Sequence, residues 1–146
     1  GSELCIRDSS AGTHAGMLAG LHAVNSKVSV LGVSVRQRCE RQIRSVYDLA
    51  RNTAAQLTEK PLEIQAVQVD DNYVGEGYGL PTDGTLRAID FAAKYEGLLL
   101  DPVYSAKGFD GMISFVQNNY FSANEDIVFI HTGGSAALFA YGDELG

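Results

Sequence analysis

Three short segments combine small residues with hydroxyl, phenol or imidazole side chains, the groups that bind anions or hold and transfer protons. These segments are SSAGTHAG (9–16), DPVYSAKG (101–108) and HTGG (131–134). In an open parallel sheet, ligands bind beyond the carboxyl ends of the strands. Because each segment follows an expected strand or opens an expected helix, we predict that the three meet at one edge of a sheet and form a ligand site.

The first segment has the composition of an anion-binding loop. Ser10, Ala11 and Gly12 are small enough for the backbone to approach an anion, and Thr13 adds a hydroxyl. A helix that begins here presents free N–H groups and the positive end of its dipole to a phosphate. The loop matches neither of the common glycine-rich nucleotide motifs. The residues alone leave a second interpretation open, a Ser or Thr N-cap on an ordinary helix.

Four other side chains have both a chemical and a structural interpretation. His14 is interpreted as a polar residue of a first helical turn, and His131 as either a site imidazole or a hydrogen-bonded structural residue. Tyr78, in GYGLP, is either a loop anchor or a site phenol. Lys107 follows the tyrosine and serine of DPVYSAKG closely, which suggests a reactive amine.

The spacing of apolar residues predicts an α/β fold, with a parallel sheet flanked by helices in one domain. Strands are expected at 27–35, 64–69, 97–100 and 126–132. Helices are expected at 17–25, 38–58, 82–92, 105–119 and, after a glycine turn, up to 141. Residues 70–81 are rich in Gly and Tyr, which predicts an irregular and functional loop.

Composition argues against nucleic-acid binding, membrane insertion and metal binding. The chain has 146 residues, 45% of them hydrophobic, and a net charge of −7 without a basic run, so no nucleic-acid partner is expected. The apolar runs are too short for a bilayer and no signal peptide opens the chain, so we expect no membrane partner and a soluble, cytoplasmic protein. Cys5 and Cys39 form no zinc motif or disulfide scaffold, and no metal site is indicated.

Residues 1–8 differ from the remainder. Gly1 and Ser2 are typical of an expression scar, and ELCIRD (3–8) shows neither strand alternation nor a helical face. We therefore expect an artificial N-terminus, and a loop at residue 9 that follows a strand that is missing or replaced.

Several motifs together resemble one family. In order, they are SSAGTHAG, GYGLPTDGTLRAI, GLLLDPVYSAKG, GM and FIHTGGSAALFAY. They are similar to the C-terminal half of the D-cysteine desulfhydrase and 1-aminocyclopropane-1-carboxylate deaminase family, over about residues 9–142. The resemblance implies a pyridoxal 5'-phosphate enzyme of the tryptophan-synthase-β fold, known as fold type II. Residues 9–146 would then be the C-terminal portion of the large, cofactor-binding domain of an enzyme that is a homodimer when full length.

The resemblance also implies roles for individual residues. The cofactor's phosphate would be bound by Ser10, Ala11, Gly12 and Thr13. The family usually has glycine at the position of Ala11, a small departure. Tyr78 and Tyr104 correspond to active-site phenols near the substrate and the cofactor ring. With an ordinary pKa of about 10, a phenol is suited to orientation, stacking or acid catalysis rather than to acting as a base.

Two positions bear on the reaction. The deaminase branch resembles DPVYEGK with HLGG, whereas this chain has Ser105 and Thr132, which would lie beside the cofactor ring as neutral hydrogen-bonding groups. A neutral partner leaves the ring a weaker electron sink, which favours β-elimination over opening of a cyclopropane. The implied reaction converts a small amino acid, D-cysteine, to pyruvate, sulfide and ammonia. L-cysteate sulfo-lyase and deaminase activities are the alternatives.

The family's Schiff-base lysine has no counterpart here. The lysines are Lys27, Lys60, Lys94 and Lys107. Lys107 corresponds to a family lysine with a different role, and the lysine that binds the cofactor belongs to an N-terminal half outside this sequence. We therefore expect the chain alone to be inactive as a carbon–sulfur lyase. The other class left open is a non-catalytic phosphate-binding module.

Overall fold

A computed structural model describes residues 2–142 and contains one parallel sheet. Its four strands lie in the order β3-β2-β1-β4, and every neighbouring pair is parallel. The strands are β1 (Ser2–Asp8), β2 (Ser29–Ser34), β3 (Gln68–Asp70) and β4 (Asp126–Ile130). The predicted parallel sheet flanked by helices is confirmed.

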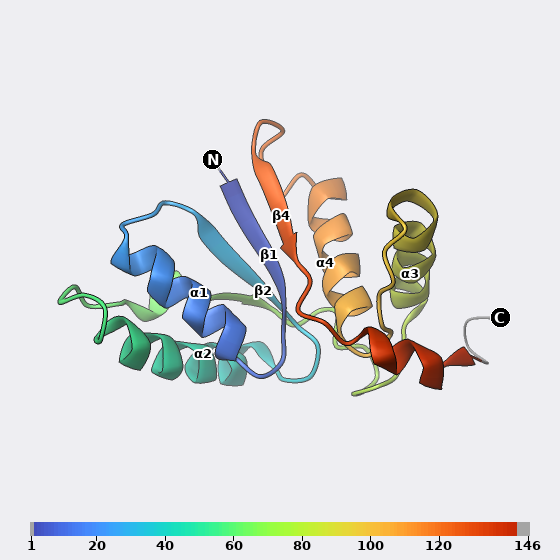
Figure 1. Ribbon diagram of the computed structural model, residues 1–146, viewed down its shortest axis with the longest axis horizontal. Coiled ribbons are helices and arrows are strands. Elements are labelled where there is room, and N and C mark those ends of the chain that lie inside the picture. Colours follow the sequence, from blue (N-terminus) through green and yellow to red (C-terminus); the bar gives the residue numbers. More distant parts are fainter. Residues whose placement is uncertain (1, 143–146) are drawn as a thin grey trace.

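The helices lie on both sides of this sheet (Figure 1). They are α1 (Gly12–Ala23), α2 (Cys39–Ala54), α3 (Asp83–Glu96) and α4 (Ser105–Gln117), with short 3-10 helices η1 (Ile64–Ala66) and η2 (Ser135–Ala140). α1 and α2 cover one face, α4 covers the other, and α3 packs on α4. None of the described helices is both long and apolar enough to cross a membrane.

Successive residues of β1 contribute to opposite faces of the sheet. Cys5 packs in the cluster on the α4 side, and Ile6 packs in the cluster formed with α1 and α2. The same alternation directs Arg7 and Asp8 to opposite faces, because side chains in a strand alternate with a period of two. β1 therefore ends with one charged group on each side of the sheet.

The expectation that residues 3–8 form no strand is wrong. β1 pairs with β2 on one side and with β4 on the other, and Cys5 and Ile6 are completely buried. A strand covered on both faces does not show the apolar–polar alternation of a half-buried strand. The loop at residue 9 therefore follows a strand that is present. The artificial origin of residues 1–8 stays a prediction, and Gly1 and residues 143–146 lie outside the described residues.

Two other predicted strands differ from the structure. Residues 97–100 pair with no strand of the described sheet. Gly97 ends α3 with φ 64°, and the N–H of Leu98 donates to Ala92 of that helix. In 64–69, the first residues form η1 and pairing begins at Gln68. The predicted helix at 82–92 is confirmed as α3, and Thr82 and Thr85 form a reciprocal capping box at its start.

Candidate functional site

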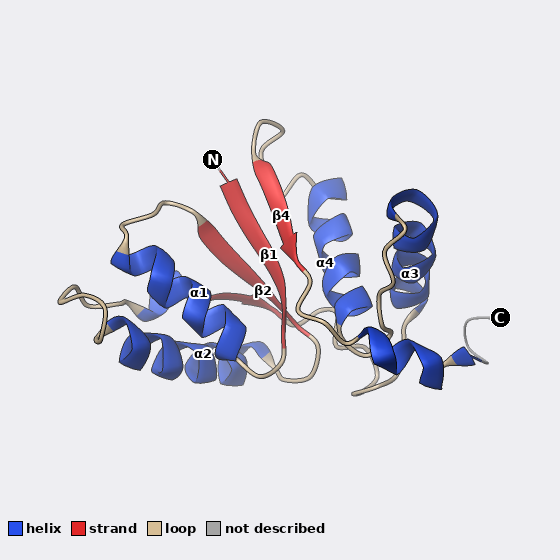
Figure 2. Ribbon diagram, viewed as in Figure 1, coloured by secondary structure: helices blue, strands red, loops and turns tan. Residues whose placement is uncertain are grey.

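Four loops approach each other at the carboxyl edge of the sheet (Figure 2). They follow β1, β3 and β4 or precede α4, and they include all the segments singled out for their chemistry. Parallel strands place such loops together, where ligands of α/β proteins bind. The arrangement of the strands brings the segments after β1 and β4 to one edge. The segment before α4 meets them through Arg7, which contacts Ser9, Thr132 and Tyr104.

The loop after β1 is closed at its base by a buried network. His14 Nδ1 and Asp8 Oδ2 are 2.6 Å apart, and Gln42 Nε2 of α2 donates to Asp8 Oδ1 at 2.8 Å. All three side chains are at most 2% exposed. Because Asp8 and His14 flank residues 9–13, their contact fixes both ends of the loop. His14 is therefore a buried partner of Asp8 and not simply a polar first-turn residue.

Gly32 on β2 makes room for this network. A Cβ atom at Gly32 would lie 2.7 Å from both Asp8 Oδ2 and His14 Nδ1, closer than side-chain atoms pack. With Nδ1 facing Asp8, His14 Nε2 is buried and has no hydrogen-bond partner among the described residues. The network is thus fitted tightly against the sheet and leaves one imidazole nitrogen unsatisfied.

α1 begins without a side-chain cap. Its N-cap is Ala11, with φ 64°, and no side chain accepts from the first turn. The first turn also holds no acidic residue, and Ala15 N–H is the donor to the Ala11 carbonyl. The predicted alternative of a Ser or Thr N-cap is therefore wrong. The exposed residues at this end of the helix are Ser10, Gly12 and Thr13.

This end of α1 fits the phosphate of pyridoxal phosphate by the chemistry of its donors. Uncapped N–H groups and exposed hydroxyls bind oxyanions, and the helix dipole adds positive charge. Ala11, where the resembling family has glycine, already adopts the left-handed conformation. The departure at this position therefore leaves the shape of the loop intact.

The two predicted phenols come together. Tyr78, in the loop after β3, and Tyr104, the N-cap of α4, form a hydrogen bond between their hydroxyls. Their rings meet edge to face, with centroids 5.8 Å apart. The hydrogen bond with Tyr78 raises the pKa of Tyr104 above 10.0, burial adds to the rise, and the Arg7 guanidinium opposes it. Tyr104 is therefore a protonated group near neutral pH, suited to donating a hydrogen bond.

Tyr104 is positioned by a second buried carboxylate, Asp101. Asp101 Oδ2 accepts from the backbone N–H groups of Val103 and Tyr104 at 3.0 and 2.8 Å, and Oδ1 accepts from Ser105 N–H at 2.9 Å. The Ser105 hydroxyl donates to Asp101 Oδ1 at 2.7 Å and accepts from Asp101 N–H at 2.8 Å. Ser105 is completely buried. The Ser105 hydroxyl is thus hydrogen-bonded to Asp101. The position of Ser105 beside a cofactor ring stays a prediction.

Arg7 is the site residue that the sequence interpretation missed. Its Nε donates to Thr132 Oγ1 at 2.7 Å and its Nη1 donates to Ser9 Oγ at 2.6 Å. Its guanidinium carbon lies 4.7 Å from the centroid of the Tyr104 ring. Arg7 thereby connects the loop after β1, the loop after β4 and the N-terminus of α4. A strand prediction for residues 3–8 would have placed it at this edge.

Lys107 does not reach this edge as a free amine. Its side chain is fully buried, and Nζ donates to the Val74 and Gly77 carbonyls at 2.6 and 3.2 Å. Burial lowers the pKa of the amine from its ordinary value. Lys107 therefore holds the loop that carries Tyr78. The initial suggestion of a reactive lysine is replaced by a structural role.

The remaining lysines lie elsewhere. Lys94 pairs with Asp90 on the exposed side of α3, and the Lys60 amine donates to Asn25. Lys27 and Lys60 precede β2 and β3, so they lie at the amino edge of the sheet. None of these three lysines therefore reaches the loops at the carboxyl edge, and Lys107 contacts one of those loops only through its buried hydrogen bonds to two carbonyls.

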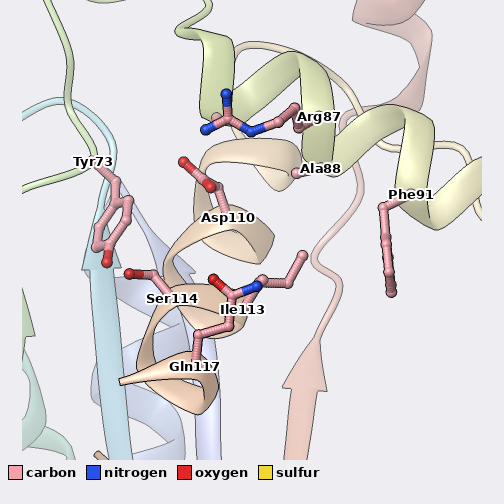
Figure 3. A pocket seen from close by; sticks show the side chains of 9 residues that line it. Tyr73, Arg87, Ala88, Phe91, Asp110, Ile113, Ser114 and Gln117 are labelled. Atoms are coloured by element: carbon pink, nitrogen blue, oxygen red, sulfur yellow. The ribbon is translucent and has the colours of Figure 1, made fainter. Parts of the chain in front are cut away.

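A separate hollow of about 450 Å³ lies between α3 and α4 (Figure 3). Asp110 and Arg87 line it, and burial raises the pKa of the Asp110 carboxyl while Arg87 opposes the rise. None of the predicted site residues lines this hollow. We therefore keep it apart from the candidate site.

Comparisons with known proteins show which proteins the chain is similar to. The family model described as pyridoxal-phosphate dependent enzyme matches residues 8–133. The chain is 39% identical over 141 residues to D-cysteine desulfhydrase of Salmonella paratyphi C (strain RKS4594), which covers 96% of this chain and 42% of that protein. The same values hold for D-cysteine desulfhydrase of Salmonella choleraesuis (strain SC-B67).

A solved structure gives the same result at the level of the fold. The crystal structure of an ACC deaminase homologue matches with a TM-score of 0.85 and 30% identity, covering 99% of this chain and 43% of that one. The chain spans less than half the length of each of these relatives.

Proposed function

Because the chain belongs to the pyridoxal-phosphate dependent enzyme family, we propose that its carboxyl edge binds pyridoxal 5'-phosphate. The enzyme would eliminate the β-substituent of a small amino acid. The observation that carries the proposal is the N-terminus of α1, which has no side-chain cap. The Asp8–His14 contact holds this loop in place. A preformed loop of free N–H groups binds a phosphate without first having to become ordered.

Different residues of this chain would bind different parts of the cofactor and substrate. The loop at Ser10–Thr13 would bind the phosphate, and Thr132 would lie near the ring, as the resemblance implies. Tyr104, held as a protonated phenol, would donate a hydrogen bond to an oxygen of the substrate or cofactor. Tyr78 would orient Tyr104 through the hydrogen bond between their hydroxyls.

When bound, pyridoxal phosphate supplies an electron sink for the bond broken at the α-carbon of an amino acid, so that a β-substituent can leave. D-cysteine is the proposed substrate, because the relatives reported above are D-cysteine desulfhydrases. L-cysteate remains the second candidate. Ser105 supports elimination over deamination, because it stands where the deaminase branch has glutamate.

We propose that the chain alone binds the cofactor but does not catalyse. A pyridoxal enzyme needs a lysine amine that reaches the cofactor. Lys107 is buried against two carbonyls, and the other lysines lie away from the carboxyl edge. A lysine from outside residues 1–146 would complete the site.

Titration of the purified chain with pyridoxal phosphate and with pyridoxal tests the binding proposal. Saturable binding of pyridoxal phosphate, much tighter than that of pyridoxal and competed by inorganic phosphate, is expected. Borohydride reduction followed by peptide mass spectrometry should give no lysine adduct in the site. Equal affinity for the two compounds would show that the phosphate is not recognised. Pyruvate formation from D-cysteine by residues 1–146 alone would contradict the need for a further lysine.

A chimera tests the activity. This chain would replace the matching part of the Salmonella D-cysteine desulfhydrase, and the chimera would be assayed for pyruvate from D-cysteine and from L-cysteate. Turnover of D-cysteine in preference to L-cysteate is expected. A folded chimera that binds the cofactor but prefers L-cysteate would move the proposal to the sulfo-lyase reaction.

A further inference from the structure

Arg7 is held at three points around the candidate site. It donates hydrogen bonds to Ser9 and Thr132, and its guanidinium lies over the ring of Tyr104. Cation–ring contacts within about 6 Å are attractive, so the stacking adds to the two hydrogen bonds. A guanidinium fixed in this way is preorganised, because its side chain has little freedom left to lose on binding a ligand.

The backbone of Arg7 is fixed as well. A Cβ atom at Gly108 of α4 would lie 2.6 Å from Arg7 Cβ and 3.1 Å from Arg7 Cα. The first turns of α4 therefore pack directly against the end of β1, which is an interior strand of the sheet. The position of the guanidinium is thus set by two elements of the fold.

The charge of Arg7 has no carboxylate partner among residues 2–142, where the ion pairs involve other residues. The neighbouring Asp8 carboxylate lies on the opposite face and is bonded to His14 and Gln42. The first turn of α1, which follows Ser9 closely, contains no acidic residue and has the positive end of the helix dipole. Two positive groups thus meet at one loop of a chain whose net charge is −7. An anion bound between them would relieve their repulsion.

We propose that Arg7 binds the phosphate of the ligand, together with the first N–H groups of α1. The inference rests on the proposed function, since that function supplies the phosphate. It adds a residue to which the sequence interpretation gave no role. A guanidinium matches phosphate geometry, and its charge-assisted hydrogen bonds are stronger than those of neutral donors.

Binding measurements on the full chain test this inference. The ligands are pyridoxal phosphate, inorganic phosphate and pyridoxal, and the variants are Arg7→Gln, Arg7→Lys and the control Arg44→Gln. Arg44 is exposed on α2, so its replacement makes the same change in net charge away from the site. We expect Arg7→Gln to weaken binding of pyridoxal phosphate and inorganic phosphate about tenfold or more. Arg7→Lys should recover part of that loss, Arg44→Gln should bind like the parent, and pyridoxal binding should change little.

The outcomes separate the two proposals. If the parent binds pyridoxal phosphate more tightly than pyridoxal and Arg7→Gln binds both phosphates equally well, the role of Arg7 is wrong and the proposed function stands. If Arg7→Gln weakens only pyridoxal binding, Arg7 acts on the ring and the inference is overturned. If the parent shows no preference for the phosphate, the proposed function fails and the inference fails with it.

A chemical measurement on the unmodified chain covers the case in which Arg7→Gln does not fold. Phenylglyoxal modifies arginines, and peptide mass spectrometry reports the rate at each one. Inorganic phosphate should slow modification of Arg7 several-fold and leave Arg44 unchanged. The same rate at Arg7 with and without saturating phosphate would overturn the inference.

Discussion

Asp8 and Asp101 are both buried and both organise a loop of the candidate site, but their partners differ in kind. Asp8 accepts from side chains of α1 and α2, and one partner, Gln42, is 34 residues away. Asp101 accepts from backbone N–H groups and the hydroxyl within the next four residues. The first aspartate therefore depends on the assembled sheet and helices, whereas the second organises its own turn.

One loop of the candidate site is therefore held by tertiary contacts, and the other by local hydrogen bonds. The loop that would bind phosphate is held by tertiary contacts between three elements, so it forms only when the domain has folded. The turn that positions Tyr104 is local and resembles an N-cap, in which a short polar side chain satisfies the first N–H groups of a helix. Loss of Asp8 should therefore affect the whole domain, and loss of Asp101 mainly α4 and Tyr104.

The largest effect is expected for Asp8→Ala. The substitution leaves His14 and Gln42 buried without their acceptor, and each buried group left unsatisfied typically costs about 1–3 kcal/mol. Urea unfolding followed by circular dichroism gives the free energy of unfolding. Asp48→Ala, at an exposed aspartate of α2, is the control and should cost little. A cost for Asp8→Ala no larger than the control would contradict the structural role of the network.

Asp101→Ala should cost less, about 0.5–2 kcal/mol, which is the range for loss of a side-chain N-cap at the start of a helix. Asp101→Asn keeps one acceptor oxygen and should recover part of this loss. The same urea experiment measures both variants. If Asp101→Ala destabilised the chain more than Asp8→Ala, the distinction between a local and a tertiary organiser would be wrong.

A pH measurement extends the comparison to Lys107, which holds the Tyr78 loop beside the Asp101 turn. Burial lowers its pKa below 10.5 in the folded chain. The cost of burying the charge is therefore complete at pH values below the folded pKa. It falls as pH rises towards 10.5, because the folded chain releases its proton before the unfolded chain does.

The parent should therefore become more stable relative to Lys107→Met as pH rises through this range. Thermal unfolding of both proteins between about pH 7 and 10 measures the difference. Effects of other groups cancel when the two proteins are compared at each pH. Lys94→Met should not show this trend, because the hydrogen bond with Asp90 raises the pKa of the exposed Lys94 and gives any dependence on pH the opposite sign. A constant difference between the parent and Lys107→Met across this range would contradict the perturbed amine.

The smallest effect concerns the cysteines, which report opening of the sheet. Burial raises the pKa of Cys5 to about 12 and its side chain is inaccessible, whereas Cys39 is partly exposed. A thiol reagent should label Cys39 of the native chain faster than Cys5. Asp8→Ala should accelerate labelling of Cys5 more than Asp101→Ala does, because Asp8 ends the same strand. Mass spectrometry of each peptide gives the rates, and equal acceleration would weaken the contrast.

The same contrast explains how far the sequence predicts the molecule. The valines of β2, the apolar spacing of α2 and the Thr82 cap are local signals, and the corresponding elements are confirmed. β1 was missed because both of its faces are covered, so the buried residues Cys5 and Ile6 are adjacent and do not alternate with exposed ones. The strand also ends in Arg7 and Asp8, whose partners Thr132 and Gln42 lie far along the chain. Leu98–Leu100 has strand-forming composition but pairs with no strand of the described sheet.

In the candidate site, too, features with a local sequence signal were predicted and features that depend on tertiary contacts were not. The motifs identified the loop at Ser10–Thr13 and both phenols, whose proximity the structure supports. Their roles stay predictions. The Asp8 network and Arg7 could not be derived from spacing, because each depends on which face of β1 a side chain occupies and on what the fold places opposite.

Backbone NMR of the ¹⁵N-labelled chain during titration with pyridoxal phosphate tests the central claim most directly, since each N–H group reports its own environment. The claim is that the N–H groups at the start of α1 bind the cofactor's phosphate. The largest shift changes should occur at Ser10–Thr13, with much smaller changes when pyridoxal replaces pyridoxal phosphate. Changes confined to other regions, such as Arg38 and Arg41 at the start of α2, would contradict the claim. Equal changes with both compounds would contradict it as well.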